Sequence, residues 1–267
     1  MSLKMDNIEC AKLEPNKQIG SGSSGDVELM KYNGKLIIRI GTAAAISEFD
    51  KLESPQGCKH IIDFYGWTNT PNHKIGLVTE YADGEDLHKY LIRNSLNDEE
   101  KEKMAGQISV GLAECHNHNI IHSDLKPENI LVVIKNSKLL LKIADFSART
   151  VLWAAPERLC KNELFKRYYD ESQLPKLLEL QNNYIKNPTL SDIYSYGLIL
   201  WEIAMNGEEI YEEQNNNIEK VMKIKACGNI DDLISKLSEQ ECPKNLETLI
   251  RKCCTFNPEN RLQKIKE

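Results

Sequence analysis

The sequence predicts an α+β protein in which a small sheet lobe precedes a larger helical lobe. Short apolar runs separated by Gly and Asn-Gly turns fill the first third, whereas apolar residues at helical spacing dominate the rest. The pattern changes near Ala82–Asp86, so we place the sheet lobe at residues 1–82 and the helical lobe at 83–267. A chain of 267 residues is long enough for two lobes that share a cleft.

Several strands are predicted in the sheet lobe. Residues 16–41 alternate apolar runs with turns, and Asn33-Gly34 between two such runs is a strong hairpin signal. A helix is predicted from about Ala43 to Glu53, because Ser54-Pro55 follows it. Residues 61–67 and 74–82 are predicted to form two more strands.

Three segments of the second part have helical patterns. Residues 98–119 are amphipathic with acids in the first turn. Residues 191–207 are strongly apolar, which predicts a buried helix with Gly207 as its stop. Residues 245–262 are predicted to form a helix followed by a turn.

Composition excludes several classes of protein. The chain is 41% hydrophobic and 28% charged, as ordinary globular proteins are, and its net charge of -6 gives no support for a nucleic-acid partner. No apolar run approaches the roughly 18 residues of a membrane span, and the first ten residues lack the apolar core of a secretion signal. The 8 cysteines include no Cys-x-x-Cys, so we expect free, mostly buried thiols, no zinc and a cytoplasmic location.

The stretch "GSGSSGDV" places Gly20, Gly22 and Gly25 between two predicted strands. Glycine has no Cβ, so backbone amides here can approach phosphates closely. A glycine-rich loop between two strands is typical of a cover over nucleotide phosphates. A plain glycine-rich hairpin is the alternative.

The stretch "HSDLKPEN" carries an acid, a base and an amide at fixed offsets. Asp124 can orient and deprotonate a hydroxyl, Lys126 can neutralise phosphate charge, and Asn129 can hold a metal. Asp145 follows a predicted strand in "KIADFS" and is a second candidate ligand, because Mg²⁺ prefers carboxylate and amide oxygens.

Together with "WAAPE" and "SDIYSYG", these motifs resemble the eukaryotic protein kinase superfamily from Ile19 to about Leu262. The resemblance implies a bilobal protein-kinase fold, with a five-stranded antiparallel sheet and one helix in the small lobe. It also implies ATP and Mg²⁺ as cofactors and a protein substrate or signalling partner. Lys126 is typical of Ser/Thr-directed members, and "WAAPE" and "LILWEI" lean toward the tyrosine-kinase-like branch. Nothing in the sequence indicates the oligomeric state.

The resemblance also implies roles for individual residues. The implied catalytic residues are Asp124 as base, Lys126 as γ-phosphate contact, Arg39 at the place of the strand lysine, and Glu48 as its helix partner. The implied magnesium ligands are Asn129 and Asp145. The implied nucleotide-binding residues are Gly20, Ser21, Gly22, Gly25, Val27, the gatekeeper Thr79, and the hinge from Glu80 to Ala82. Glu157 and Arg261 resemble the family's buried ion pair, and Asp192 resembles the anchor beneath the catalytic loop.

The chain departs from the family pattern around the nucleotide. Arg39 stands where the family has lysine, and its planar fork differs in reach from a compact ammonium. A surface arginine is the alternative interpretation. Ile37 replaces a small residue, so extra methyl groups are expected to crowd the adenine site at a cost of about 1–3 kcal/mol.

Further departures lie in the activation segment. Ser147 replaces the glycine of Asp-Phe-Gly, and the segment from Asp145 to Glu157 is short. Ser123 replaces the arginine that clamps a phosphorylated loop in the family, so switching by loop phosphorylation is not expected.

An insertion near residues 160–188 lengthens the stretch between Glu157 and Asp192, and its spacing is helical. Either it packs beside the catalytic cleft and contacts substrate or partner, or it is a solvated insertion.

We consider three functions. The first is a protein kinase that transfers the ATP γ-phosphoryl to protein Ser/Thr. The second is a pseudokinase, a signalling or scaffold module with weak or no nucleotide binding and no transfer. A small-molecule phosphotransferase shares the His-x-Asp loop, but "WAAPE" and "SDIYSYG" argue against it.

Overall fold

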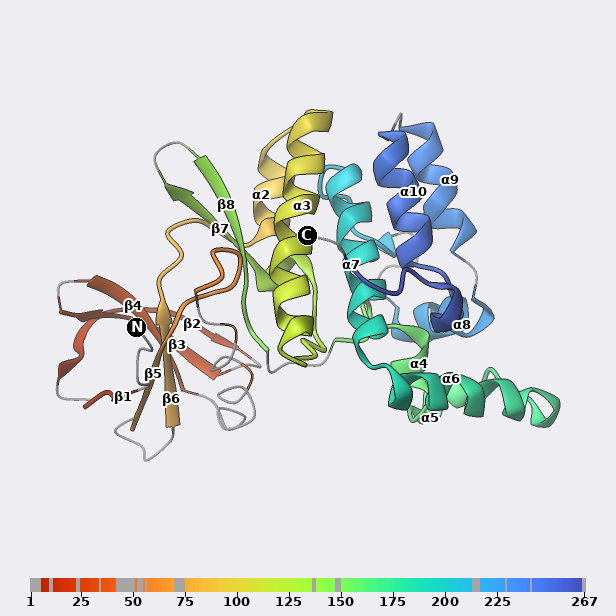
Figure 1. Ribbon diagram of the computed structural model, residues 1–267, viewed down its shortest axis with the longest axis horizontal. Helices are drawn as coiled ribbons and strands as arrows, with labels where there is room; N and C mark the ends of the chain where they lie inside the picture. The colour runs from red at the N-terminus through yellow and green to blue at the C-terminus, as the bar shows by residue number, and fades with distance from the viewer. Residues whose placement is uncertain are drawn as a thin grey trace.

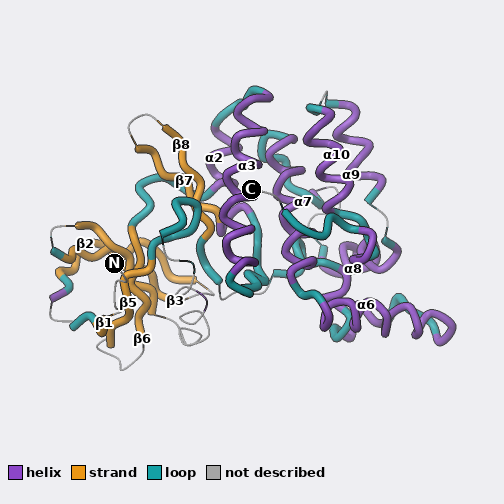
Figure 2. Tube along the Cα trace, viewed as in Figure 1, coloured by secondary structure: helices purple, strands orange, loops and turns teal. Residues whose placement is uncertain are grey.

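The computed structural model describes residues 6–9, 12–22, 25–33, 35–41, 51, 55, 57–69, 75–135, 138–146, 150–212, 217–228, 230–240 and 242–265. Strands gather at the N-terminal end of the molecule and helices at the other, with a two-stranded ribbon between them (Figures 1 and 2). The predicted order of strands first and helices after is therefore observed. No helix in these ranges is long and apolar enough to cross a membrane.

The sheet lobe holds a six-stranded sheet in the order β1-β5-β6-β4-β3-β2. Its strands are β1 (Asp6–Asn7), β2 (Glu14–Gly22), β3 (Gly25–Tyr32), β4 (Lys35–Gly41), β5 (Phe64–Asn69) and β6 (Ile75–Glu80). Strands β2 to β6 pair antiparallel, as predicted, but β1 adds a parallel edge beside β5. The prediction of five strands was wrong because two residues are too few to show a period.

The predicted hairpin at Asn33-Gly34 is confirmed. Tyr32 pairs with Lys35, and Asn33 has a φ of 49°, in the left-handed region that tight two-residue turns require. The helix predicted from Ala43 to Glu53 lies outside the described residues except for Lys51, which is helical.

This hairpin register decides which face of the sheet Ile37 occupies. Ile37 is buried and clusters with Val78, Met30, Ile8 and Leu13. The side chains of adjacent strand residues point to opposite faces of the sheet. Ile37 and Val78 therefore lie on one face, and Thr79, the expected gatekeeper, lies on the other. The expectation that Ile37 crowds the adenine site stays a prediction, because the place of Thr79 beside the adenine is itself an expectation.

The helical lobe is built around one buried helix. Its helices are α2 (Leu87–Arg93), α3 (Asp98–Asn117), α4 (Pro156–Leu159), α5 (Glu163–Lys166), α6 (Leu174–Lys186), α7 (Thr189–Ala204), α8 (Ile218–Cys227), α9 (Asp231–Glu239) and α10 (Lys244–Cys253). In α7 every residue from Leu190 to Ala204 is buried, as its apolar sequence predicted. The helix ends at Ala204, and Gly207 closes the following turn with a φ of 89°.

Helices α3 and α10 pack against α7. Asn97 caps α3 and forms a reciprocal capping box with Glu100, which satisfies two backbone amides at its start. A Cβ on Gly197 of α7 would lie 2.6 Å from Cys253 Cβ and from Cys254 Sγ. Only glycine lets α10 approach α7 this closely. The turn predicted after α10 contains the short 3₁₀ helix Pro258–Asn260.

The predicted buried ion pair is present. The Arg261 guanidinium donates to both carboxylate oxygens of Glu157, at 2.6 Å and 3.2 Å, and both residues are buried. Arg261 also donates to the carbonyl of Leu190 at 2.6 Å. The pair therefore joins α4 and the start of α7 to the C-terminal turn.

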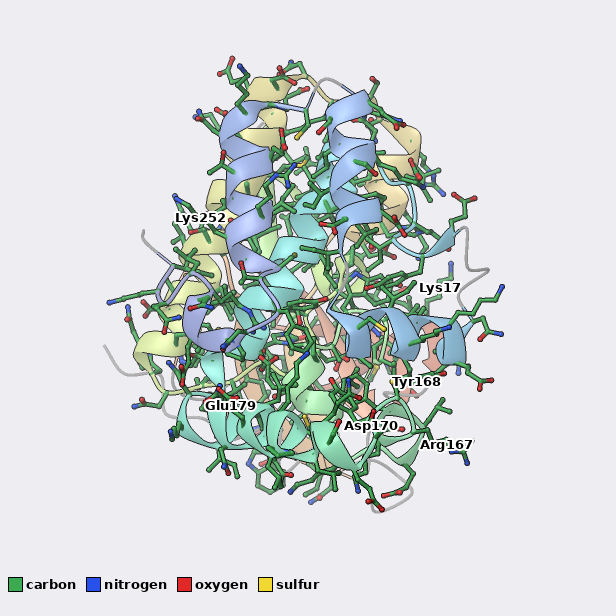
Figure 3. The ribbon with its side chains drawn as sticks, turned by 90° about the vertical axis from the view of Figure 1, so that its right-hand side faces the viewer. Lys17, Arg167, Tyr168, Asp170, Glu179 and Lys252 are labelled. Atoms are coloured by element: carbon green, nitrogen blue, oxygen red, sulfur yellow. The ribbon has the colours of Figure 1, made fainter. Side chains whose placement is uncertain are left out.

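The predicted insertion is folded rather than solvated. It comprises α5, a 3₁₀ turn (Glu171–Gln173) and α6, and Figure 1 places α6 at the end of the molecule remote from the sheet. Phe165, Tyr169 and Leu177 form a buried cluster with Met222 of α8. The Tyr168 and Tyr169 hydroxyls donate to carbonyls of α8, at 3.0 Å and 3.1 Å, and Figure 3 shows Tyr168 below that helix. The insertion is thus a buttress of α8.

The thiol prediction holds for the described residues. Seven described cysteines are free, and four of them are buried: Cys115, Cys160, Cys253 and Cys254. Burial raises the pKa of each buried thiol, so these side chains behave as small apolar groups.

The division into a sheet lobe that ends at residue 82 and a helical lobe that begins at residue 83 stays a prediction.

Candidate active site

A loop from residue 121 to Asn129 joins α3 to the ribbon of β7 (Ile130–Lys135) and β8 (Lys138–Ile143). Asp192 of α7 supports it from below. The Asp192 carboxylate accepts the backbone N–H groups of His122 and Ser123, at 2.8 Å and 2.9 Å, and a bond from His116 at 3.1 Å. Burial opposes ionisation of Asp192, but the His116 bond and charge, with those of the loop, lower its pKa overall. Asp192 therefore occupies the anchoring place that the resemblance implied.

Ser123 stands in a conformation that few side chains adopt. Its φ is 74°, and its carbonyl accepts a hydrogen bond from the guanidinium of Arg158 in α4. Arg158 thus holds the same loop that Asp192 holds. The sequence analysis did not single out Arg158, because its contact joins segments distant in the chain.

Asp124 is the buried centre of the site. Asn129 Nδ2 donates to Asp124 Oδ2 at 3.1 Å and to the Asp124 carbonyl at 2.8 Å. Lys126 Nζ lies 3.4 Å from Asp124 Oδ2 and donates to Thr150 Oγ1 at 3.1 Å. The Thr150 N–H donates to Asp124 Oδ1 at 2.5 Å. The structure thus brings together an acid, an ammonium and an amide, and adds Thr150, whose only sequence signal was a hydroxyl shortly before "WAAPE".

Asp145 reaches the same place from the end of β8. Asn129 Nδ2 lies 3.5 Å from the Asp145 carbonyl, and Asp145 has a φ of 56°. Phe146 is buried, with its ring centroid 4.4 Å from that of His122. Asp124, Asn129 and Asp145 therefore converge from two segments that β7 and β8 hold side by side.

The donor set at this point fits Mg²⁺. Asn129 uses its Nδ2 as the donor to Asp124, which leaves Oδ1 as the amide atom with lone pairs for a cation. Asp145 carries a carboxylate, and its backbone carbonyl lies 3.5 Å from Asn129 Nδ2. Mg²⁺ in nucleotide sites commonly takes one or two protein oxygens and fills its shell with phosphates and water.

Backbone register locates the expected glycine-rich loop. Gly20 pairs with Val27 and Gly22 with Gly25, so these glycines lie where β2 turns into β3. The structure does not describe the side chains of Ser21 and Arg39. Arg39 is placed by its backbone alone, in β4 opposite Val78 of β6.

Of the remaining nucleotide-site residues, some are described by the structure and one is not. Glu48 lies outside the described residues, so its pairing with Arg39 stays a prediction. Thr79 and Glu80 end β6, and Ala82 follows them in the connection to α2; all three are buried.

Glu80 has a role that the sequence did not predict. Its side chain pairs with the buried ammonium of Lys142 on β8, and it accepts the Asp63 N–H at 3.0 Å. Lys142 also donates to the Ile61 carbonyl at 3.3 Å. The end of β6 is therefore locked to the strand that leads to Asp145.

A cavity of about 280 Å³ opens beside Lys126. It is lined by His88, Lys126, Glu128, Thr150, Leu152, Trp153, Glu209 and Ile210. None of these residues belongs to the insertion. The insertion lines no part of this cavity, but Phe165 and Tyr169 share a buried cluster with Ala154, which directly follows the lining residue Trp153. The hypothesis that the insertion contacts substrate or partner stays a prediction.

Glu202 of α7 lies beneath this cavity. Glu202 Oε1 accepts the Trp153 indole N–H at 3.0 Å, and Oε2 lies 3.6 Å from His88 Nδ1. Burial raises the pKa of Glu202 to about 7, and the nearby Glu202 carboxylate raises the pKa of His88. Each of the two groups thus keeps its proton to a higher pH than usual.

The segment that follows Thr150 is held from the other side as well. Lys225 of α8 is buried, and its Nζ donates to the Ala154 carbonyl at 2.8 Å. Burial lowers the pKa of Lys225 to about 7. Thr150 and Ala154 are thus tied to the catalytic loop and to α8 respectively.

A bilobal fold with this convergence of Asp, Lys, Asn and Asp is that of a protein kinase. The family model described as protein kinase domain matches residues 13–266, and the chain belongs to this family. It is similar to the RAF proto-oncogene serine/threonine-protein kinase of Xenopus laevis, with 29% identity over 252 residues. The match covers 88% of this chain and 37% of that relative, so the chain spans little more than a third of the relative's length.

Proposed function

We propose that this protein transfers the γ-phosphoryl group of ATP to Ser or Thr hydroxyls of protein substrates. The observation that carries the proposal is the set in which Asn129 donates to Asp124 and Lys126 pairs with it at 3.4 Å, with the Asp145 backbone 3.5 Å from Asn129. Phosphoryl transfer needs mainly positioning and neutralisation of charge, and this set supplies both.

Each residue has a distinct task in this proposal. Asp124 orients the substrate hydroxyl and takes its proton, while the Thr150 N–H fixes the Asp124 carboxylate. Lys126 neutralises charge on the transferred group. Asn129 and Asp145 hold Mg²⁺, which when bound neutralises charge on the nucleotide phosphates.

Further residues complete the proposed nucleotide site. The glycine-rich turn with Gly20, Ser21, Gly22, Gly25 and Val27 covers the phosphates, and Thr79, Glu80 and Ala82 border the adenine. Arg39 and Glu48 take the place of the lysine–glutamate pair. The name of the Xenopus relative supports Ser/Thr specificity, and the Lys126–Thr150 contact agrees with it. We also propose the tyrosine-kinase-like branch, a cytoplasmic location, and lobes at 1–82 and 83–267.

The test is transfer of label from γ-³²P-ATP with Mg²⁺ to a mixture of Ser/Thr peptides. Asp124→Asn is expected to lower the rate about 10²- to 10⁴-fold, because the amide cannot accept the proton. Glu179→Gln is the matched control, since Glu179 is an exposed acid of α6 (Figure 3) and its loss should leave the rate unchanged.

A pseudokinase is the second candidate, favoured by Arg39 in place of the strand lysine and by the short segment from Asp145 to Glu157. Thermal melting with and without Mg-ATP separates the two functions. A melting shift without transfer, in the wild type and in Arg39→Lys, would leave the signalling module. If both forms show no melting shift and no transfer, the kinase proposal is overturned.

A further inference from the structure

Lys51 makes a contact that the proposed mechanism does not use. It is a helical residue of the described part of the chain between β4 and β5, and it is partly buried. Its Nζ lies 3.1 Å from the Phe146 carbonyl and 3.3 Å from the His122 carbonyl. These two acceptors are 24 residues apart in the chain (146 − 122) and belong to different loops.

The two carbonyls flank the proposed catalytic acids. His122 lies two residues before Asp124, and Phe146 directly follows Asp145. A displacement of either carbonyl therefore displaces an acid, because only one or two backbone units separate them. An ammonium has three N–H donors and can bridge two carbonyls. Hydrogen bonds from a charged donor are also roughly twice as strong as neutral ones.

The surroundings of Lys51 make this bridge stiff. His122 accepts the Asp124 N–H on Nδ1 at 3.2 Å, so its Nε2–H donates to the Ala144 carbonyl at 3.1 Å. Burial lowers the pKa of His122, and the Lys51 charge acts in the same direction, whereas nearby acids oppose it. The lowered pKa favours this neutral ring. The His122 ring also packs on Phe146. Both carbonyls that Lys51 contacts thus belong to residues that are already fixed.

We propose that Lys51 is a positioning residue that holds the catalytic loop and the Asp145–Phe146 segment at a fixed separation. It carries this constraint from the stretch between β4 and β5, so the position of Lys51 sets the distance between Asp124 and Asp145. The kinetic part of this inference rests on the proposed function. The structural part concerns the two loops alone.

The test compares Lys51→Met, which keeps the aliphatic stem and removes the donors, with Lys51→Arg, which keeps a cationic donor. Lys51→Met is expected to lower kcat about 10- to 100-fold with a peptide KM within about twofold, since a misplacement near 1 Å costs about that much. Lys51→Arg should recover most of the loss. The control is Lys252→Met, an exposed lysine of α10 on the far lobe (Figure 3), which should change neither constant.

A second readout does not depend on activity. Amide hydrogen exchange of the unliganded protein should speed up in the segments around 120–126 and 143–146 in Lys51→Met, and return toward wild type in Lys51→Arg. Should Lys51→Met fail to fold, Lys51→Gln is measured in the same way. Unchanged exchange in both segments, or a kcat within twofold of wild type, overturns the proposal. If the wild type transfers no phosphate, the kinase proposal fails and exchange alone decides the role of Lys51.

Discussion

At the scale of single residues, Glu202 is unusual because a fully buried carboxylate lies beside a cavity with more acids. His88, Glu128 and Glu209 line that cavity, and Trp153 donates to Glu202 Oε1. Glu202 Oε2 has no hydrogen-bond partner among the described residues and has only the nearby His88 ring for charge compensation. An acid in such a place resists ionisation.

Glu202 should therefore make stability depend on pH. Its pKa is about 7 in the folded protein against an ordinary value of 4.5. Its contribution is fully present below about pH 4.5 and is lost as pH rises through about 7, and the raised pKa of His88 acts in the same direction. Urea unfolding at pH 5.5 and pH 8 should show a fall in unfolding free energy of up to about 2 kcal/mol from Glu202.

Glu202→Gln should flatten this dependence, because the amide keeps an acceptor for Trp153 and cannot ionise. Its gain over the wild type should be larger at pH 8 than at pH 5.5. Glu179→Gln, at an exposed position, should leave the dependence intact. Parallel pH curves for wild type and Glu202→Gln would contradict the prediction.

The sequence predicted those site residues that lie in short contiguous motifs. Asp124, Lys126 and Asn129 share one loop, so their spacing alone indicated their chemistry. Lys51 and Lys142 could not be found in this way, since each acts through tertiary contacts with loops far along the chain.

At the scale of elements, α6 distinguishes a folded insertion from a solvated one. Leu177 is 6% exposed and packs in the cluster with Phe165 and Met222. Leu178, the next residue, is 59% exposed. One turn of helix therefore offers two leucines in opposite environments.

Leu177→Ala should lower the unfolding free energy by about 2–5 kcal/mol, since it removes buried methyl groups and leaves a cavity. Leu178→Ala should stay within about 0.5 kcal/mol of the wild type, because it alters only the surface. Chemical denaturation of the two variants in parallel makes the comparison. Equal effects would mean that α6 does not pack on α8 in solution.

Elements with long, regular patterns were predicted well. Helices α3, α7 and α10 appear close to their predicted bounds because their apolar spacing spans several turns. Strand β1 was not predicted. It depends on how strands pair, and pairing is set by turn geometry and tertiary contacts rather than by local pattern.

At the scale of the whole molecule, one hydrophobic core joins the lobes. It extends from Phe64 and Leu77 in the sheet, past Ile143, to α7 and α10. The residues of β2 from Glu14 to Ile19 are exposed instead. Local stability should therefore fall from α7 toward the edge of the sheet.

Hydrogen exchange of the wild-type protein checks this gradient. Amides of α7 should exchange slowest, because they open only when the shared core opens, and those of β2 should exchange fastest among the paired strands. Protection of β2 equal to that of α7 would contradict the prediction and imply a further cover over the sheet edge.

Two hydrogen-bonded contacts restrain the activation segment. Phe146 is bound through its carbonyl to Lys51, and Thr150 through its amide to Asp124. The four peptide units between them can stretch to at most about 14 Å, and a few residues later Ala154 is fastened to Lys225. While these contacts hold, Thr150 stays near Asp124 and Ala154 stays near Lys225. A rearrangement at this place must therefore begin with the partners Lys51, Asp124 or Lys225.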